Sequence, residues 1–331
     1  MTWQGEAQES TLDNIQKFWA DKAEGFQNAH GGMMRDHFYR TTEINLVRNM
    51  LHNRRVLDAG CGAGWATMHY AAVAKSVVGF DITKGLIDRA NRMMSDHEFR
   101  RDKYWKGLTP WGAPPYISNV TFEVQDVLDL PYERGEFEAV MCQRLLINLP
   151  SFELQEQALA NLVETLVPGG VLVISEVTED GHGRVNALRK LFGLDPLERY
   201  WHNCYLNHEQ FTAAMEKLPL NSMGPGCLDI YGFLSKVVYP AMVCPEEPQF
   251  MSGFNLAAAM VSQLYPDSSH LNMGMYAFMD EVFRGALSFY WPEVPWVEAY
   301  DAVVTRMDCM SIDATAIRGC NHQALYVAER S

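Results

Sequence analysis

The sequence predicts an α/β protein with a doubly wound sheet, and three observations support that prediction. Short, apolar, strand-like runs alternate with amphipathic, helix-like runs from residue 54 to residue 177. A glycine-rich turn follows the first strand-like run, and acidic residues stand where the next two runs end. Strands separated by helices form a parallel sheet covered on both faces, and such sheets bind ligands at the carboxyl ends of their strands. We therefore expect five loops to converge on one cleft, namely those after Ala59, Phe80, Gln125, Cys142 and Ser175.

The strands and helices of this core follow from residue pattern. Runs rich in apolar and β-branched residues predict strands at 55–59, 76–81, 120–127, 137–142 and 171–176. Apolar residues at helical spacing predict helices at 65–74 and 83–94. A further helix should begin behind Ser151, whose hydroxyl suits an N-cap, and should stop at the Pro-Gly-Gly turn of residues 168–170.

The segments around the core make the chain one elaborated domain rather than two. A helical stretch is expected at 184–217, and amphipathic helices are expected at 11–26 and 41–51. The predicted division is a helical cap at 1–52, a core at 53–180 completed by strands near 226–234 and 322–328, a helical insertion at 181–220 and a second insertion at 236–318.

The second insertion, 236–318, is rich in methionine and has three open interpretations. It contains eight of the 18 methionines of the chain. Methionine side chains form adaptable apolar surfaces. The insertion is therefore a helical lid over a substrate, a face for a homodimer, or ordinary core packing.

Composition excludes several classes of function. The chain of 331 residues has 27 basic and 41 acidic side chains, a net charge of −14, which argues against nucleic-acid and anionic-membrane partners. It has no apolar run long enough to span a membrane and no export signal at its start. Its seven cysteines contain no CxxC pair, and its ten histidines contain no HExxH pattern. We therefore expect a cytoplasmic protein without a metal site.

The most informative segment is VLDAGCGAG at 56–64, which places a glycine turn at the tip of the first strand. Asp58 stands two residues before the first glycine, and Asp81 and Asp126 follow the next two strands. Dinucleotide-binding turns have a small residue where this chain has Trp65, so NAD binding is disfavoured. Three carboxylates around the turn suit a ligand that carries an ammonium group and no phosphate.

This pattern resembles the class I S-adenosylmethionine (SAM)-dependent methyltransferases over residues 56–177. Residues 18–19, 143–150 and 201–205 are similar to a bacterial small-molecule subgroup of them. The resemblance implies a seven-stranded Rossmann-like sheet, mostly parallel, with an antiparallel last strand. It also implies SAM as cofactor and a small-molecule substrate as partner. The cofactor site that it implies consists of Asp58, Gly60, Cys61, Gly62, Gly64, Trp65, Asp81, Ile82, Gln125, Asp126, Val127, Gln143 and Arg144.

The resemblance also assigns roles within this set. The three glycines would let the backbone approach the methionyl part of SAM, and Asp58 would face its amino group. Asp81 would accept hydrogen bonds from both ribose hydroxyls, and Ile82 would pack on the adenine. Asp126 would accept from the adenine amino group, with Val127 beside the ring. Gln143 and Arg144 would border the methionyl end and the substrate side.

The N-terminal segment resembles a helix that closes over the cofactor in this subgroup. Trp19 and Tyr39 are therefore candidates to cover the sulfonium, because a positive charge is favoured near aromatic faces. The alternative is that both rings simply pack on the core. Arg40 is expected to pair with Glu43 at the surface rather than to hold the cofactor carboxylate.

Four residues are candidates for the chemistry on the acceptor. His202 is the first candidate for a general base, since histidine needs little tuning to act near neutral pH. The alternative role for His202 is to orient neighbouring backbone. Glu176, at the tip of the fifth strand, should face the cleft and could bind a substrate amine. Asn148 and Tyr205 could orient the substrate through hydrogen bonds.

Two enzymatic reactions fit these residues. The first is methyl transfer to a small molecule by in-line attack on the sulfonium methyl group. The alternative cleaves another carbon–sulfur bond of SAM, whose own amine closes an azetidine-2-carboxylate ring and releases methylthioadenosine. A non-catalytic module that binds SAM is a third possibility, disfavoured by the complete set of acidic positions.

Overall fold

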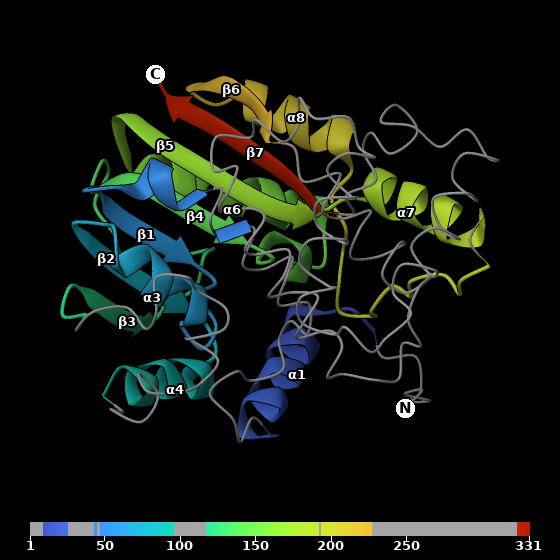
Figure 1. The fold of residues 1–331 in the computed structure, drawn as a ribbon, viewed down its shortest axis with the longest axis horizontal. Helices are drawn as coiled ribbons and strands as arrows, with labels where there is room; N and C mark the ends of the chain where they lie inside the picture. Colours follow the sequence, from blue (N-terminus) through green and yellow to red (C-terminus); the bar gives the residue numbers. More distant parts are fainter. Residues whose placement is uncertain (1–8, 26–42, 45–46, 96–116, 192, 227–322) are drawn as a thin grey trace, which may run out of the picture.

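The computed structural model describes residues 9–25, 43–44, 47–95, 117–191, 193–226 and 323–331. Within them lies a seven-stranded sheet of order β3-β2-β1-β4-β5-β7-β6 (Figure 1). Strands β1 to β5 pair in parallel, and β7 runs antiparallel to both β5 and β6. The sheet confirms the predicted fold class. Its strands are β1 Arg55–Ala59, β2 Ser76–Asp81, β3 Val120–Val124, β4 Phe137–Gln143, β5 Leu166–Val177, β6 Leu220–Gly226 and β7 Gln323–Arg330.

Helices α1, α3, α4 and α6 lie where the sequence predicted helices. The Ser151 side chain caps α6 as predicted, accepting a hydrogen bond from the Leu154 N–H at 3.4 Å. In the described ranges no helix has the length and apolar character to cross a membrane. The helical elements are α1 Leu12–Gly25, η1 Asn49–Leu51, α3 Trp65–Ala71, α4 Lys84–Ser95, η3 Leu146–Asn148, α6 Phe152–Thr165, α7 Glu179–Leu191 and α8 His208–Glu216.

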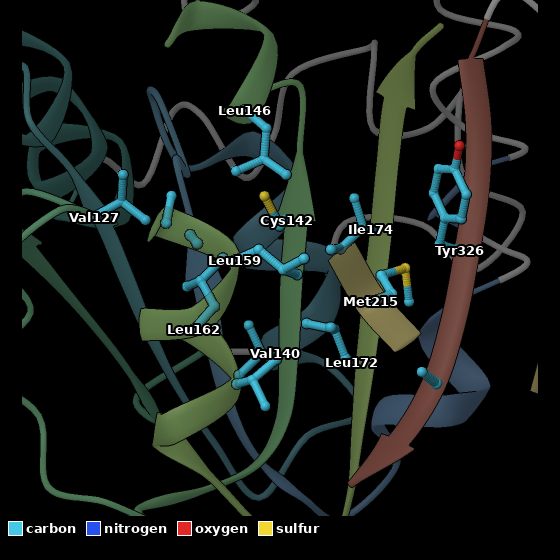
Figure 2. Packing of buried hydrophobic residues seen from close by; sticks show 14 of the residues in the cluster. Val127, Val140, Cys142, Leu146, Leu159, Leu162, Leu172, Ile174, Met215 and Tyr326 are labelled. Atoms are coloured by element: carbon cyan, nitrogen blue, oxygen red, sulfur yellow. The ribbon is translucent and has the colours of Figure 1, made fainter. Parts of the chain in front are cut away.

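The main core lies between α6 and the centre of the sheet. Figure 2 shows Leu159 and Leu162 of α6 facing Val140 of β4 and Leu172 of β5. All four side chains are fully buried. Burying one such side chain stabilises a fold by about 1.5–3 kcal/mol. The central strands therefore form a rigid base for the loops at their ends.

Strand register brings the predicted loops together. Ala59 at the end of β1 lies opposite Phe80 of β2 on one side and Cys142 of β4 on the other. The Cys61 N–H donates to the Phe80 carbonyl at 2.8 Å, and the Arg144 N–H donates to the Ser175 carbonyl at 3.0 Å. The loops after β1, β2, β4 and β5 therefore meet at one edge of the sheet.

Three strand boundaries differ from the predictions. Strand β3 ends at Val124 instead of residue 127, and β5 begins at Leu166, before the Pro-Gly-Gly turn that was expected to precede it. The sixth strand begins at Leu220 rather than at residue 226 and is described as far as Gly226. Its sequence contains Gly224 and Pro225, which suit strands poorly, but pairing with β7 imposes the strand, and a proline is tolerated at the edge of a sheet.

The predicted helical stretch 184–217 is two helices, α7 and α8, joined by a segment without regular structure. Pro196 lies in that segment, lacks a backbone N–H and disfavours helix in the residue before it. The segment returns to the sheet edge, where Leu206 and Val177 share a backbone hydrogen bond of 3.0 Å. It carries His202 toward the site.

Helix α1 lies against α4 on the side of the sheet where the strands end (Figure 1). A Cβ atom added to Gly85 of α4 would lie 3.0 Å from the Cβ of Ala23. The indole N–H of Trp19, also in α1, donates to Oδ1 of Asn148 at 2.9 Å. Asn148 lies in the loop that follows β4. Helix α1 thus joins the loops after β2 and β4. The predictions for Tyr39, Arg40, the 227–234 part of the sixth strand and the 236–318 insertion lie outside the described residues.

Candidate cofactor and catalytic site

The turn after β1 has a backbone that glycine alone adopts without strain. Gly60, Gly62 and Gly64 have φ values of 70°, 57° and 77°. An added Cβ at Gly64 would lie 2.6 Å from Phe122 Cζ, and one at Gly60 would lie 2.9 Å from Leu145 Cβ. The turn is therefore fixed by close packing against the strands and loops around it.

Asp81, at the end of β2, holds this turn. Its Oδ2 accepts from the Gly62 N–H at 3.0 Å, and its Oδ1 accepts from the Thr83 N–H at 2.9 Å. Burial raises the pKa of Asp81 above its usual value, although the two N–H groups act in the opposite direction. A carboxylate has about four acceptor sites, so Asp81 can also accept from two ligand hydroxyls.

Beside Asp81 the structure presents an apolar surface and a second acidic loop. The Ile82 side chain is 38% exposed, an unusual position for isoleucine. The Gln125 N–H donates to the Asp81 carbonyl at 3.2 Å, and Asp126 Oδ1 accepts from the Leu128 N–H at 2.9 Å. The Val127 side chain is buried in the main core, and its expected place beside a bound ring stays a prediction.

Three other predicted cofactor residues lie in the glycine turn or in the elements on either side of it. Asp58 is buried, and its Oδ2 accepts from the Thr67 hydroxyl at 2.6 Å. Trp65 is buried with its ring edge-on to that of His69. Burial, with Asp81 and Asp58 nearby, raises the pKa of the Cys61 thiol well above its usual value. These side chains support the turn, and the predicted contact of Asp58 with an amino group stays a prediction.

The loop after β4 contains a strained residue and an unpaired amide. Arg144 has a φ of 55°, rare for a residue with a side chain. Gln143 is 8% exposed, and within the described residues its Nε2 has no hydrogen-bond partner. An unpaired buried donor at the carboxyl end of a central strand suits a ligand acceptor such as a carboxylate.

Glu43 is a buried residue at this site that the sequence analysis did not include among the site residues. It is fully buried, and Arg144 Nη1 lies 3.0 and 2.8 Å from its two carboxylate oxygens. The expected surface pair of Glu43 with Arg40 is wrong in its location, since Glu43 is inside the protein. Glu43, Val47 and Leu51 are spaced four residues apart and are all buried. This helical spacing could have indicated from the sequence that Glu43 is buried.

Glu176 differs from its predicted place facing the cleft. The side chain is fully buried, and its Oε1 accepts from the backbone N–H groups of Leu145 and Leu146 at 2.8 and 2.7 Å. Its position at the end of β5 makes it the anchor of the loop after β4. Burial raises the pKa of Glu176 to about 8, despite these N–H groups and Arg144.

The raised pKa of Glu176 predicts a pH dependence of stability. Between its ordinary value of 4.5 and about 8, the folded protein binds more protons at this site than the unfolded chain does. The stability from this group is therefore full below about pH 4.5 and is lost as the pH rises to about 8. In Glu176→Gln, the decline of the unfolding free energy between pH 5.5 and 8, measured with urea, should be smaller than in the wild type. Glu164→Gln, which breaks an exposed ion pair with Arg134, should keep the wild-type decline; an equal slope in both variants would contradict this assignment.

His202 lies in a group of rings that we call the aromatic cluster: Phe18, Trp19, Tyr200, Trp201 and His202. The imidazole stacks on Phe18 at 4.2 Å and on Tyr200 at 5.5 Å between ring centroids. The two tryptophan rings meet it edge-on at 5.6 and 5.5 Å. Burial, with Lys22 nearby, lowers the pKa of His202 to about 4. The prediction of a base poised near neutral pH is therefore wrong, and His202 is a neutral ring at pH 7.

The two residues predicted to orient the substrate, Tyr205 and Asn148, both contact other residues of the protein. Tyr205 is buried beside Ile147 and Val177, with the Arg199 guanidinium 4.8 Å from its ring centre, and its hydrogen bond to a substrate stays a prediction. Asn148 donates from Nδ2 to the Arg144 carbonyl at 2.7 Å and accepts from Trp19. Its hydrogen bonds join α1 to the loop after β4, and its contact with a substrate stays a prediction.

A cavity of about 320 Å³ adjoins the aromatic cluster. Aromatic rings, a guanidinium, a hydroxyl and an amide give it both apolar and hydrogen-bonding walls. The Arg199 guanidinium is fixed by Glu179, with an N···O distance of 2.5 Å. The lining residues are Ser10, Pro150, Arg199, Tyr200, Trp201, Asn203 and Cys204.

The part of the chain that contains the glycine turn and strands β1 to β4 is similar to known proteins. Residues 57–174 match a family model described as a methyltransferase domain. The chain is 28% identical over 156 residues to the U6 snRNA methylphosphate capping enzyme Amus of Drosophila melanogaster, which covers 45% of this chain and 49% of that protein. It is 23% identical over 170 residues to a ubiquinone biosynthesis O-methyltransferase of Coxiella burnetii, which covers 51% and 63%. The chain thus spans half to two thirds of the length of these relatives.

Among solved structures, the N-methyltransferase NodS of Bradyrhizobium japonicum in complex with S-adenosyl-L-homocysteine is similar, with a TM-score of 0.45 and 18% identity over 65% of this chain and 90% of that one. The strand order, the left-handed glycine turn and Asp81 at the end of β2 define a doubly wound α/β domain, and the methyltransferase family model matches this part of the chain. The match identifies residues 57–174 as a methyltransferase domain and supports SAM as the cofactor.

Proposed function

We propose that this protein transfers the methyl group of SAM to a small-molecule acceptor. The observation that carries the proposal is the glycine turn fixed to Asp81 by the Gly62 N–H. Asp81 and Asp126 both offer carboxylate oxygens at this edge of the sheet, and Ile82 offers an exposed apolar side chain. These groups suit ribose hydroxyls, an adenine amino group and an adenine face, and they would repel a phosphate.

When bound, SAM supplies a methyl group on a positively charged sulfur. The aromatic cluster supports this charge, because a cation is favoured within about 6 Å of an aromatic ring centre. The low pKa of His202 contributes, since a neutral imidazole does not repel the sulfonium. Trp19 is held toward the β4 loop by Asn148, so its ring is positioned rather than free.

A small acceptor is supported by the cavity beside the aromatic cluster. Its volume of about 320 Å³ lies at the lower end of the range for ligand pockets, about 300–1,000 Å³. Ser10, Arg199 and Asn203 offer hydrogen bonds that would orient an acceptor. Orientation supplies much of the rate enhancement in a displacement reaction, so this role needs no ionised base. The net charge of −14 argues against RNA as the acceptor.

Product analysis tests the proposal against its alternative. The protein is incubated with SAM alone, with SAM and a metabolite extract below 1 kDa, and with SAM and total RNA. We expect S-adenosylhomocysteine and one new methylated metabolite in the second incubation only, because the reaction needs a small acceptor; mass spectrometry measures both.

Two other outcomes would contradict methyl transfer to a small molecule. Methylthioadenosine from SAM alone would support the cyclisation, in which the amine of SAM bonds to its γ-carbon, the γ-carbon–sulfur bond breaks and the amine loses a proton. S-adenosylhomocysteine formed only with RNA would identify a nucleic-acid acceptor instead.

A further inference from the structure

Four residues from three separate parts of the chain form one continuous series of contacts, which we call the Glu43–Trp19 relay. Glu43 pairs with the Arg144 guanidinium at 2.8 Å. The Arg144 carbonyl accepts from Asn148 Nδ2 at 2.7 Å, and Asn148 Oδ1 accepts from the Trp19 indole N–H at 2.9 Å. The relay thus begins at a buried carboxylate and ends on helix α1.

The contact between Glu43 and Arg144 costs folding free energy, which indicates that it has a role other than stabilising the fold. Glu43 is fully buried, and removing ionised groups from water is expensive even when they are paired. Arg144 adopts a left-handed backbone with a φ of 55°, and such strain persists only where the surroundings impose it. Functional sites are where strained residues gather.

The surroundings of Arg144 fix its peptide groups from several sides. Its N–H donates to the Ser175 carbonyl at 3.0 Å, and the Ser175 hydroxyl is hydrogen-bonded to Glu43. Glu43 therefore contacts both the side chain of Arg144 and the residue that binds its N–H. This arrangement turns the Arg144 carbonyl toward Asn148, which in turn presents its Oδ1 to Trp19.

We propose that Glu43 is a positioning residue that docks α1 over the cofactor cleft by holding Arg144 in its left-handed conformation. The proposal rests on the proposed function, because its readout is SAM binding. Glu43 is linked to α1 through Arg144 and Asn148 and acts through them. Without Glu43, the loop after β4 would relax, Asn148 would turn away, and Trp19 would lose its hydrogen-bond acceptor.

A double-mutant cycle on SAM affinity tests this coupling. Glu43→Gln and Trp19→Phe are measured singly and together by titration calorimetry with SAM. Each single substitution should weaken binding about 10-fold, the size of one lost hydrogen bond. The double variant should bind no more weakly than Glu43→Gln alone, because Trp19 is already released. Additive losses, about 100-fold together, would overturn the proposal, since a Glu43 that only stabilises the fold has no coupling to Trp19.

Two further measurements complete the test. Glu164→Gln breaks an exposed ion pair with Arg134 and should leave SAM affinity unchanged. If Glu43→Gln does not fold, Glu43→Leu with Arg144→Met removes both charges together, a replacement that proteins often tolerate. In that background Trp19→Phe should have no further effect, and a retained loss would overturn the proposal. A wild type that binds no SAM would overturn the proposed function itself, whereas additivity in a SAM-binding protein would overturn this inference alone.

Discussion

Asp81→Ala is expected to weaken SAM binding by at least about 100-fold. The substitution removes the acceptor of the Gly62 and Thr83 N–H groups, so the glycine turn loses its anchor. It also removes the carboxylate that we expect to accept from the ribose hydroxyls. A hydrogen bond to a charged group contributes about 1.5–3 kcal/mol, and two lost bonds correspond to a factor of roughly 100 or more. Titration calorimetry with SAM measures the change.

Two matched variants show whether this loss belongs to the site. Asp81→Asn keeps one oxygen acceptor and should give an intermediate loss. Asp129→Ala removes an exposed carboxylate from the loop after β3 and should bind SAM like the wild type. Wild-type affinity in a correctly folded Asp81→Ala protein would contradict the site assignment.

Gly64→Ala should lower the free energy of unfolding by about 2–5 kcal/mol. The left-handed backbone, with a φ of 77°, costs a residue with a side chain about 1–2 kcal/mol. The new Cβ would also lie 2.6 Å from Phe122 Cζ and 3.0 Å from the Ala90 Cβ. Such overpacking costs about 1–3 kcal/mol more. Urea denaturation followed by circular dichroism measures the difference.

The chain supplies a close control for this prediction. Gly169 has nearly the same backbone, with a φ of 76°, but nothing lies within 4 Å of an added Cβ. Gly169→Ala should therefore show the backbone cost alone, about 1–2 kcal/mol. Equal losses in the two variants would contradict the close packing at Gly64.

The elements that could be predicted from the sequence are those that depend only on residues close together in the chain. Strands β1 and β2 have the expected bounds, because apolar runs identify buried strands and the glycine turn and Asp81 end them. The Ser151 cap of α6 is equally local. The parallel order of these strands follows from the alternation of strands and helices, so the place of the cleft could also be predicted.

What could not be predicted depends on contacts between distant residues. Glu43 and Arg144 are 101 positions apart, and no local pattern pairs them. The pKa of His202 is lowered by burial and by Lys22, and both result from the packing of α1 against the segment before α8. Strand β6 has a sequence that disfavours strands, and its partner β7 lies about a hundred residues later in the chain. In each case tertiary contacts override the local signal.

The docking of α1 at two points, Ala23 against Gly85 and Trp19 on Asn148, implies an order of events during turnover. Under the proposed function, a nucleoside product bound at this edge of the sheet would leave only after the two α1 contacts open. The lifetime of these contacts, rather than the displacement itself, would then set the turnover rate.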